Sequence, residues 1–343
     1  MSICRVLTDC THGTHKYSPR FNNTITSVDL SQLFTSGYFV ILTTGKHCYG
    51  KNMPNCIPIL VYHRIDNEKL STSTSPAVFA SHLEWLSRRG WRSLTAGELD
   101  FYAARGKRMP AKSFLLTFDD GYESVFLEAL PVLKSLNFTA LCFLSTKSIR
   151  HSAVPSSSVS HGDPGFLSWQ QIREMQSGGW MEFHSHTHEH RSLSDLTRNE
   201  LTQDLATSLD HLTHELGLPS SHFRHLAWPW GESHDESRQI AARFGFQYQY
   251  TVARSGFLQS SPLQNVPRTC YDGATLTNFV IQFQLQTGMC SSLWHAGYPL
   301  ARRVRRPGFT IAFREDTGSV QVTAPLRTGL PSQRDAHNMG KAG

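Results

Sequence analysis

The sequence contains no Cys-x-x-Cys pair, and its seven cysteines are an odd number. Both features argue against a structural zinc site built from thiolates. Four of the cysteines precede the first clear strand, namely Cys4, Cys10, Cys48 and Cys56. The sequence does not decide whether these four cysteines form disulfide bonds, so cysteine usage does not fix the redox compartment.

Long apolar runs are also missing. The nearest match to the core of a signal peptide is LFTSGYFVIL at residues 33–42. This run follows a polar leader and is interrupted by Thr35, Ser36 and Gly37. We therefore expect no stable membrane span and no clear signal peptide, which leaves the localisation open.

Charge of one sign does not dominate the chain. The formal net charge is +6, from 33 basic and 27 acidic residues, and the one dense basic cluster is LARRVRRPG at residues 300–308. A single local patch does not predict nucleic-acid binding, because a solvated tail explains it equally well. Contact with an acidic polymer is the alternative.

A regular alternation of short apolar runs and amphipathic segments begins at residue 57. Strands are expected at 57–63, 113–118, 139–145, 180–185, 223–228 and 247–252. Helices are expected at 76–90, 123–137, 167–179, 197–217, 236–245 and 276–286. This alternation predicts a parallel α/β fold, for which a barrel is as natural as an open sheet. We expect one domain over residues 56–285, after a poorly defined leader (1–55) and before a loosely structured extension (286–343).

Polar motifs follow several of these strands. Asp119, Asp120 and Gly121 end the strand at 113–118, where a helix N-cap explains one aspartate but not two. Neighbouring residues point in different directions, so one carboxylate can bind a cation while the other faces a water molecule. The carboxyl ends of parallel strands carry the chemistry in both α/β architectures.

Four histidines alternate at positions 184, 186, 188 and 190. The pairs 184/188 and 186/190 both have the spacing of a helical metal site, while a strand would place all four on one face, so spacing does not choose between them. Two imidazoles and one carboxylate leave an open position for water, as a hydrolytic zinc site requires. A non-haem iron oxygenase could use the same set, but the second aspartate would then have no role.

Three motifs in order resemble those of the polysaccharide deacetylase family, the NodB-homology domain of carbohydrate esterase family 4. They are LLTFDDGY, MEFHSHTHEHRSLSDL and LAWPWGE, preceded by ILVYHRI. The chain is most similar to the branch that acts on poly-N-acetylglucosamine. The resemblance covers residues 56–285 and implies a distorted (β/α) barrel. It also implies hydrolytic removal of N-acetyl groups from N-acetylglucosamine residues of a polysaccharide in the cell envelope or outside the cell.

The same resemblance implies roles for four residues. Asp119 matches the catalytic base and Asp120 a metal ligand. The histidine motif falls on His186 and His190, because the residues before His186 and the leucines after it also match. The implied cofactor is a divalent metal ion, with Zn²⁺ as the first choice. A glycan-binding module with a degenerate site is the alternative that is not an enzyme.

The third motif departs from the family pattern, because Ala227 stands where an arginine is usual. The resemblance implies that the backbone N–H of Trp230 faces the developing oxyanion. It also implies that Tyr122, Trp228 and Pro229 contact the substrate. A buried tryptophan pair beside a Pro-Gly turn is the alternative for Trp228 and Trp230.

An alanine cannot orient the catalytic aspartate. Arg268, in NVPRTCYDG, follows an expected late strand at the place where a barrel closes beside its first strands, so we expect it to reach Asp119. The general acid stays unassigned. His295 is the late candidate, and His63 at a strand end is equally consistent with a core role.

Overall fold

The computed structural model describes residues 56–151, 165–259, 261–287, 291 and 294. The expected leader, nearly all of the expected extension and the basic cluster at 300–308 lie outside the described residues. Across the described segments, no helix combines the length and the apolar character needed to cross a membrane.

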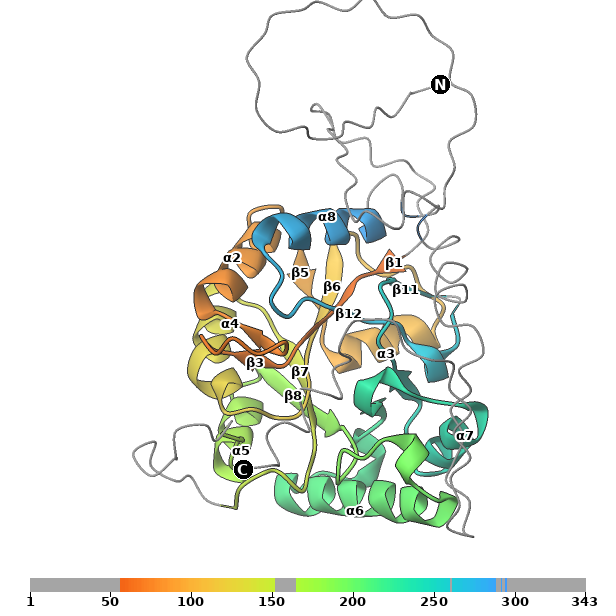
Figure 1. Cartoon of the computed structure of the whole chain (residues 1–343). Coiled ribbons are helices and arrows are strands. Elements are labelled where there is room, and N and C mark those ends of the chain that lie inside the picture. Colours follow the sequence, from red (N-terminus) through yellow and green to blue (C-terminus); the bar gives the residue numbers. More distant parts are fainter. Residues whose placement is uncertain (1–55, 152–164, 260, 288–290, 292–293, 295–343) are drawn as a thin grey trace, which may run out of the picture.

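A parallel sheet of eight strands forms the centre of the fold (Figure 1). Its order is β10-β9-β8-β7-β6-β2-β12, with β5 also pairing with β6. The strands are β2 (Ile59–Tyr62), β5 (Arg92–Ser93), β6 (Ser113–Phe118), β7 (Ala140–Leu144), β8 (Met181–Ser185), β9 (His225–Ala227), β10 (Tyr248–Tyr250) and β12 (Thr269–Cys270).

The segment that leads into β12 connects the two edges of this sheet. Val266 forms a parallel bridge with Tyr250 on β10, and Thr269 and Cys270 pair with β2. The sheet therefore curls into a distorted (β/α) barrel, which confirms the predicted fold class. Two short pairs lie outside the sheet, and they are β1 (Cys56–Ile57) with β11 (Phe257–Leu258) and β3 (Arg64–Ile65) with β4 (Ser73–Thr74).

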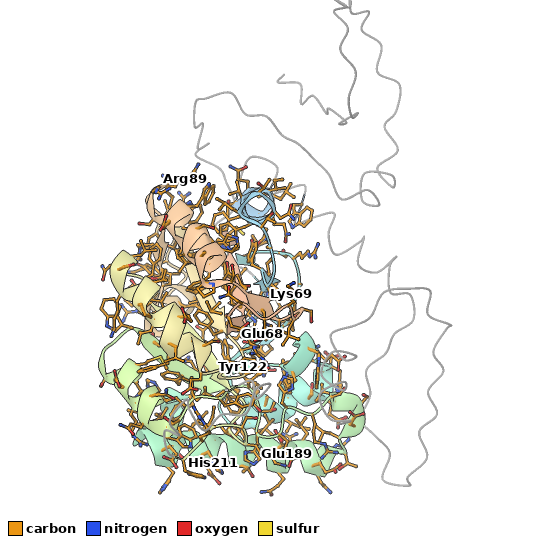
Figure 2. All side chains as sticks on the ribbon, turned by 60° about the vertical axis from the view of Figure 1, so that its left-hand side comes forward. Glu68, Lys69, Arg89, Tyr122, Glu189 and His211 are labelled. Carbon is orange, nitrogen blue, oxygen red and sulfur yellow. The ribbon has the colours of Figure 1, made fainter. Side chains whose placement is uncertain are left out.

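Helices follow most of the strands, and side chains fill the space between them and the sheet (Figure 2). They are α2 (Pro76–Ser87), α3 (Ala96–Ala104), α4 (Leu130–Leu136), α5 (Trp169–Ser177), α6 (Arg198–Leu216), α7 (Asp235–Arg243) and α8 (Leu276–Thr287). A π-helical turn, η1 (Val125–Ala129), precedes α4, so the helix expected at 123–137 is divided into two parts. Short 3-10 turns complete the described elements: η3 (Leu193–Asp195), η4 (Ser220–His222), η5 (Pro229–Gly231) and η6 (Leu263–Asn265).

Side chains of β6 alternate between two apolar cores, as strand geometry requires. Phe114, Leu116 and Phe118 pack with residues of the surrounding helices. Leu115 belongs to the inner core of the barrel, together with residues of β2, β7 and β10. Continued alternation directs Asp119, which follows β6, toward the barrel interior.

Candidate active site

Loops that follow four parallel strands of the sheet meet at its carboxyl edge. His63 follows β2, Asp119 and Asp120 follow β6, His186 follows β8, and η5 follows β9. Parallel strands direct their following loops to the same edge, so residues distant in sequence come together there.

Asp120, His186 and His190 point three ligand atoms at one another. Oδ1 of Asp120 lies 3.3 Å from Nε2 of His186 and 3.2 Å from Nε2 of His190. Oδ1 is buried, and neither contact has the geometry of a hydrogen bond. Burial would raise the pKa of Asp120, but the adjacent imidazoles of His190 and His186 outweigh burial and hold this pKa well below its usual value. An ionised carboxylate facing two imidazole nitrogens fits a divalent ion.

A backbone carbonyl fixes the orientation of the first imidazole. Nδ1 of His186 lies 2.8 Å from the carbonyl oxygen of Ala227. A carbonyl only accepts, so Nδ1 carries the hydrogen and the lone pair of Nε2 faces Asp120. Metal-binding imidazoles usually have such a partner on their second nitrogen.

The loop that carries His190 is held by α6. The carboxylate of Asp204 accepts hydrogen bonds from the backbone N–H groups of His188 and Glu189, at 2.8 and 2.9 Å. His190 has a positive φ of 54°, and its N–H donates to Oγ1 of Thr187 at 3.2 Å. Left-handed backbone at a non-glycine residue costs free energy, so the surrounding hydrogen bonds keep this residue in place.

The other two histidines of the run point elsewhere. His184 is buried on β8, and its ring centroid lies 4.6 Å from that of His225. Burial holds the pKa of His184 well below its usual value, so it is neutral. Nδ1 of His188 lies 2.9 Å from Oγ1 of Thr146. The structure therefore brings the 186/190 pair to Asp120 and leaves the 184/188 pair outside.

Arg268 reaches Asp119 through both of its terminal nitrogens. The two N···O distances, to Oδ1 and Oδ2, are both 2.7 Å, and one nitrogen also donates to Oγ1 of Thr117 at 3.2 Å. Burial disfavours ionisation of Asp119, but the guanidinium outweighs it and holds the pKa below its usual value. The expected contact is thus present, although Arg268 directly precedes β12 rather than following a strand of its own.

His63 and Asp272 form a pair that the sequence did not reveal. Nδ1 of His63 lies 2.5 Å from Oδ2 of Asp272, and the backbone N–H of His63 donates to Oδ1 at 3.1 Å. Burial opposes the imidazolium, yet the carboxylate raises the pKa of His63 well above its usual value. Its charge also helps to lower the pKa values of Asp119 and Asp120, so the imidazolium acts on the same site. The alternative candidate, His295, lies outside the described residues.

Trp228 does not contact a substrate, and the expectation for it is wrong. Its side chain is 0% exposed, and its Nε1 donates to Oε1 of Gln249 at 3.2 Å. Ala227 faces the inner core, so the next residue turns toward the helices. Pro229 is buried as well and shapes the turn of η5 rather than offering a surface.

Trp230 and Tyr122 remain next to the ligand atoms. Trp230 is half-buried with a φ of 53°, and its ring centroid lies 4.5 Å from that of His190. Tyr122 is 6% exposed and stacks on Phe166 with centroids 5.0 Å apart. Figure 2 shows Tyr122 between Glu68 and Glu189 along one side of the molecule. Their roles at the substrate stay predictions.

The chain is similar in sequence to known polysaccharide deacetylases. Residues 106–249 match the family model described as polysaccharide deacetylase. The Bacillus subtilis protein YxkH is 29% identical over 202 residues, which are 58% of this chain and 65% of that protein. The poly-beta-1,6-N-acetyl-D-glucosamine N-deacetylase of Staphylococcus epidermidis is 28% identical over 204 residues, 57% of this chain and 67% of that enzyme. The chain thus spans about two thirds of the length of these relatives.

Two solved structures are similar to the fold. IcaB from Ammonifex degensii has a TM-score of 0.56 and 26% identity, over 67% of this chain and 97% of that one. The Streptococcus pyogenes deacetylase PplD, solved in complex with acetate, has a TM-score of 0.57 and covers 67% of this chain and 99% of its own. At 23% identity, the second similarity concerns the fold alone.

Proposed function

Because the chain carries a domain of the polysaccharide deacetylase family, we propose that it hydrolyses N-acetyl groups of N-acetylglucosamine residues in a polysaccharide. One observation carries the proposal: an ionised aspartate held by a buried arginine stands beside the donor set of Asp120, His186 and His190. A base next to a divalent-metal site is what amide hydrolysis needs.

Asp120, His186 and His190 would hold the ion, and we propose Zn²⁺. The donor set supports this choice, since two imidazoles and one carboxylate with an open position are typical of hydrolytic zinc sites. When bound, the ion supplies Lewis-acid chemistry, polarising the amide oxygen and making a bound water more acidic.

Asp119 is the base in this proposal. Its Oδ2 lies 4.0 Å from Nε2 of His186, beside the ligand atoms. Arg268 occupies one lone pair on each carboxylate oxygen, and each oxygen keeps a second lone pair for the proton of the attacking water. The fork of the guanidinium fixes the carboxylate plane, so the base is oriented before substrate binds.

His63 is the general acid. It carries a proton because Asp272 stabilises the imidazolium. After water adds to the amide carbon, the carbon–nitrogen bond breaks and His63 gives its proton to the leaving nitrogen. The water proton goes to Asp119, and the products are acetate and the free amine of glucosamine.

Trp230 contributes to binding of the sugar. Its half-buried ring packs beside His190 and offers a flat apolar face, a surface on which pyranose rings stack. We propose that its backbone N–H donates to the oxyanion that forms at the amide.

The substrate class rests on the relatives. The name of the Staphylococcus epidermidis enzyme gives its substrate as poly-beta-1,6-N-acetyl-D-glucosamine. We propose the same class of polymer for this chain, and with it an action at the cell envelope or outside the cell. An oxygenase is less well supported, because the pair of Asp119 and Arg268 would then have no task.

A substrate panel tests the proposal. The zinc-loaded chain is assayed for acetate release from β-1,6-linked and β-1,4-linked N-acetylglucosamine oligomers, peptidoglycan and acetylated xylan, with Asp119→Asn as the inactive control. We expect fastest release from the β-1,6-linked oligomer. Release from xylan alone would contradict the substrate class, and binding without release would favour the glycan-binding alternative.

A further inference from the structure

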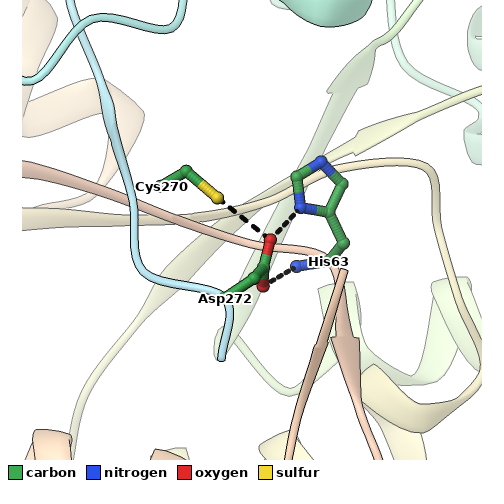
Figure 3. A group of neighbouring side chains, drawn as sticks. All are labelled: His63, Cys270 and Asp272. Carbon is green, nitrogen blue, oxygen red and sulfur yellow. Dashed lines mark hydrogen bonds and ion pairs between the residues drawn. The ribbon is translucent and has the colours of Figure 1, made fainter. Parts of the chain in front are cut away.

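A second group of ligand atoms includes the proposed general acid, His63 (Figure 3). Nδ1 of His63, Sγ of Cys270 and Oδ2 of Asp272 all lie within 4.8 Å of one another, and the three residues are half-buried. Oδ2 is 2.5 Å from Nδ1 and 3.1 Å from Sγ. Within the described part of the chain, this is the one such group besides Asp120, His186 and His190.

Sheet closure builds this group. Cys270 on β12 pairs with Val61 on β2, so the residues two positions further along each strand, Asp272 and His63, also meet. The backbone N–H of His63 holds Oδ1 of Asp272, which leaves Oδ2 directed at both the imidazole and the thiol. The three donors are therefore brought together by the pairing of β12 with β2, with Cys270 on β12 and the other two residues directly after the paired strands.

We propose that His63, Cys270 and Asp272 form a second, inhibitory site for a thiophilic divalent cation such as Zn²⁺. One nitrogen, one sulfur and one oxygen donor with a water in the fourth position match the ligands that zinc takes. Mg²⁺ and Ca²⁺ prefer oxygen donors alone, so neither suits a set that includes a thiolate.

The cluster needs only a small adjustment to bind the ion. Tetrahedral ligands about 2.1 Å from zinc stand roughly 3.4 Å apart. The contact between Sγ and Oδ2 is near that separation at 3.1 Å, whereas the contact between Nδ1 and Oδ2, at 2.5 Å, must open. Rotation of the Asp272 carboxylate would lengthen this contact.

An ion at this site would stop proton donation. It replaces the proton that His63 and Asp272 share on Nδ1, so the imidazole becomes neutral. The hydrogen left on Nε2 of a neutral imidazole is a far weaker acid than an imidazolium proton. The inhibitory effect rests on the proposed function, because it requires His63 to be the general acid, whereas binding of the ion does not.

Titration with Co²⁺ tests the binding directly, because a thiolate ligand gives a charge-transfer band in the near ultraviolet. The first equivalent should bind at Asp120 without this band, and a second equivalent should produce it. Cys270→Ser should lose both the band and the second ion, with the first ion retained as evidence of folding. Cys56→Ser, in the edge strand β1, is the matched control and should keep both. A band that survives in Cys270→Ser would overturn the site.

Inhibition is measured on the same variants. Zn²⁺ beyond the first equivalent should slow deacetylation by the unmodified chain. Cys270→Ser should need an inhibitory concentration at least about tenfold higher, because it lacks one ligand of the second ion. Equal inhibition of both would overturn the inhibitory role. If the unmodified chain released no acetate, the proposed function would fail, while the cobalt titration would still decide whether the second site exists.

Discussion

Arg268→Ala removes the guanidinium that holds the carboxylate of Asp119. Within the described residues, no other arginine contacts this carboxylate. The variant loses two charge-assisted hydrogen bonds of 2.7 Å, both buried. Such a bond contributes about 1.5 to 3 kcal/mol. Since about 1.4 kcal/mol changes a rate tenfold, losing the equivalent of one bond in the transition state lowers kcat/KM by roughly tenfold to a hundredfold.

The pH dependence of the rate provides a second readout. Burial acts to raise the pKa of Asp119, and the guanidinium now reverses that effect. Without Arg268, the pKa of Asp119 should rise, so the acid limb of kcat/KM should move to higher pH. Because Asp119 has a lowered pKa in the folded chain, its contribution to stability is present above the unfolded pKa and is lost as the pH falls through the folded value. This contribution should be smaller in the variant.

The assay compares kcat/KM across pH with the zinc content of each variant. Arg268→Lys keeps the positive charge but lacks the forked guanidinium. Its kcat/KM should therefore lie between those of the unmodified chain and Arg268→Ala. Arg243→Ala, an exposed arginine on α7, is the matched control. Unchanged turnover and an unmoved acid limb in Arg268→Ala, at normal zinc content, would refute the assigned role.

Three further predictions concern the remaining parts of the site. Asp119→Asn should retain zinc and lose turnover, whereas Asp120→Asn should lose zinc as well; equal zinc loss, measured by elemental analysis, would contradict separate roles. His190→Ala should release zinc at a modest chelator concentration while His188→Ala keeps most of it, and the reverse order would refute the assignment of the pair. Asp272→Asn should lower the pKa of the paired imidazole, so the basic limb of kcat/KM should move to lower pH; an unmoved limb would argue against this general acid.

Much of the fold could be predicted from the periodic spacing of apolar residues along the chain. The strand at 113–118 has the predicted bounds, and α6 differs from its predicted range by one residue at each end. The helix α3 was missed, although Thr95 and Glu98 form a capping box at its start. Only Ala96 and Leu99 of this helix are buried, so its sequence shows little amphipathic pattern.

The sequence predicts those site residues that directly follow a strand. It predicts less well the contacts that form only when the sheet closes. Asp119 and Asp120 directly follow β6, so the strand itself locates them. His63 and Asp272 are 209 residues apart, and only the pairing of β2 with β12 brings them together. Trp228 directly follows β9, and its motif alone does not indicate whether its side chain faces a substrate or the core.

Hydrolysis of an amide is the central claim, and the origin of the oxygen in the product tests it most directly. The zinc-loaded chain is incubated without dioxygen, in water labelled with heavy oxygen, with a β-1,6-linked N-acetylglucosamine oligomer. The released acetate should carry one labelled oxygen, and the oligomer should lose the mass of its acetyl groups. Asp119→Asn should release none. Turnover that requires dioxygen, or acetate without the label, would contradict the account.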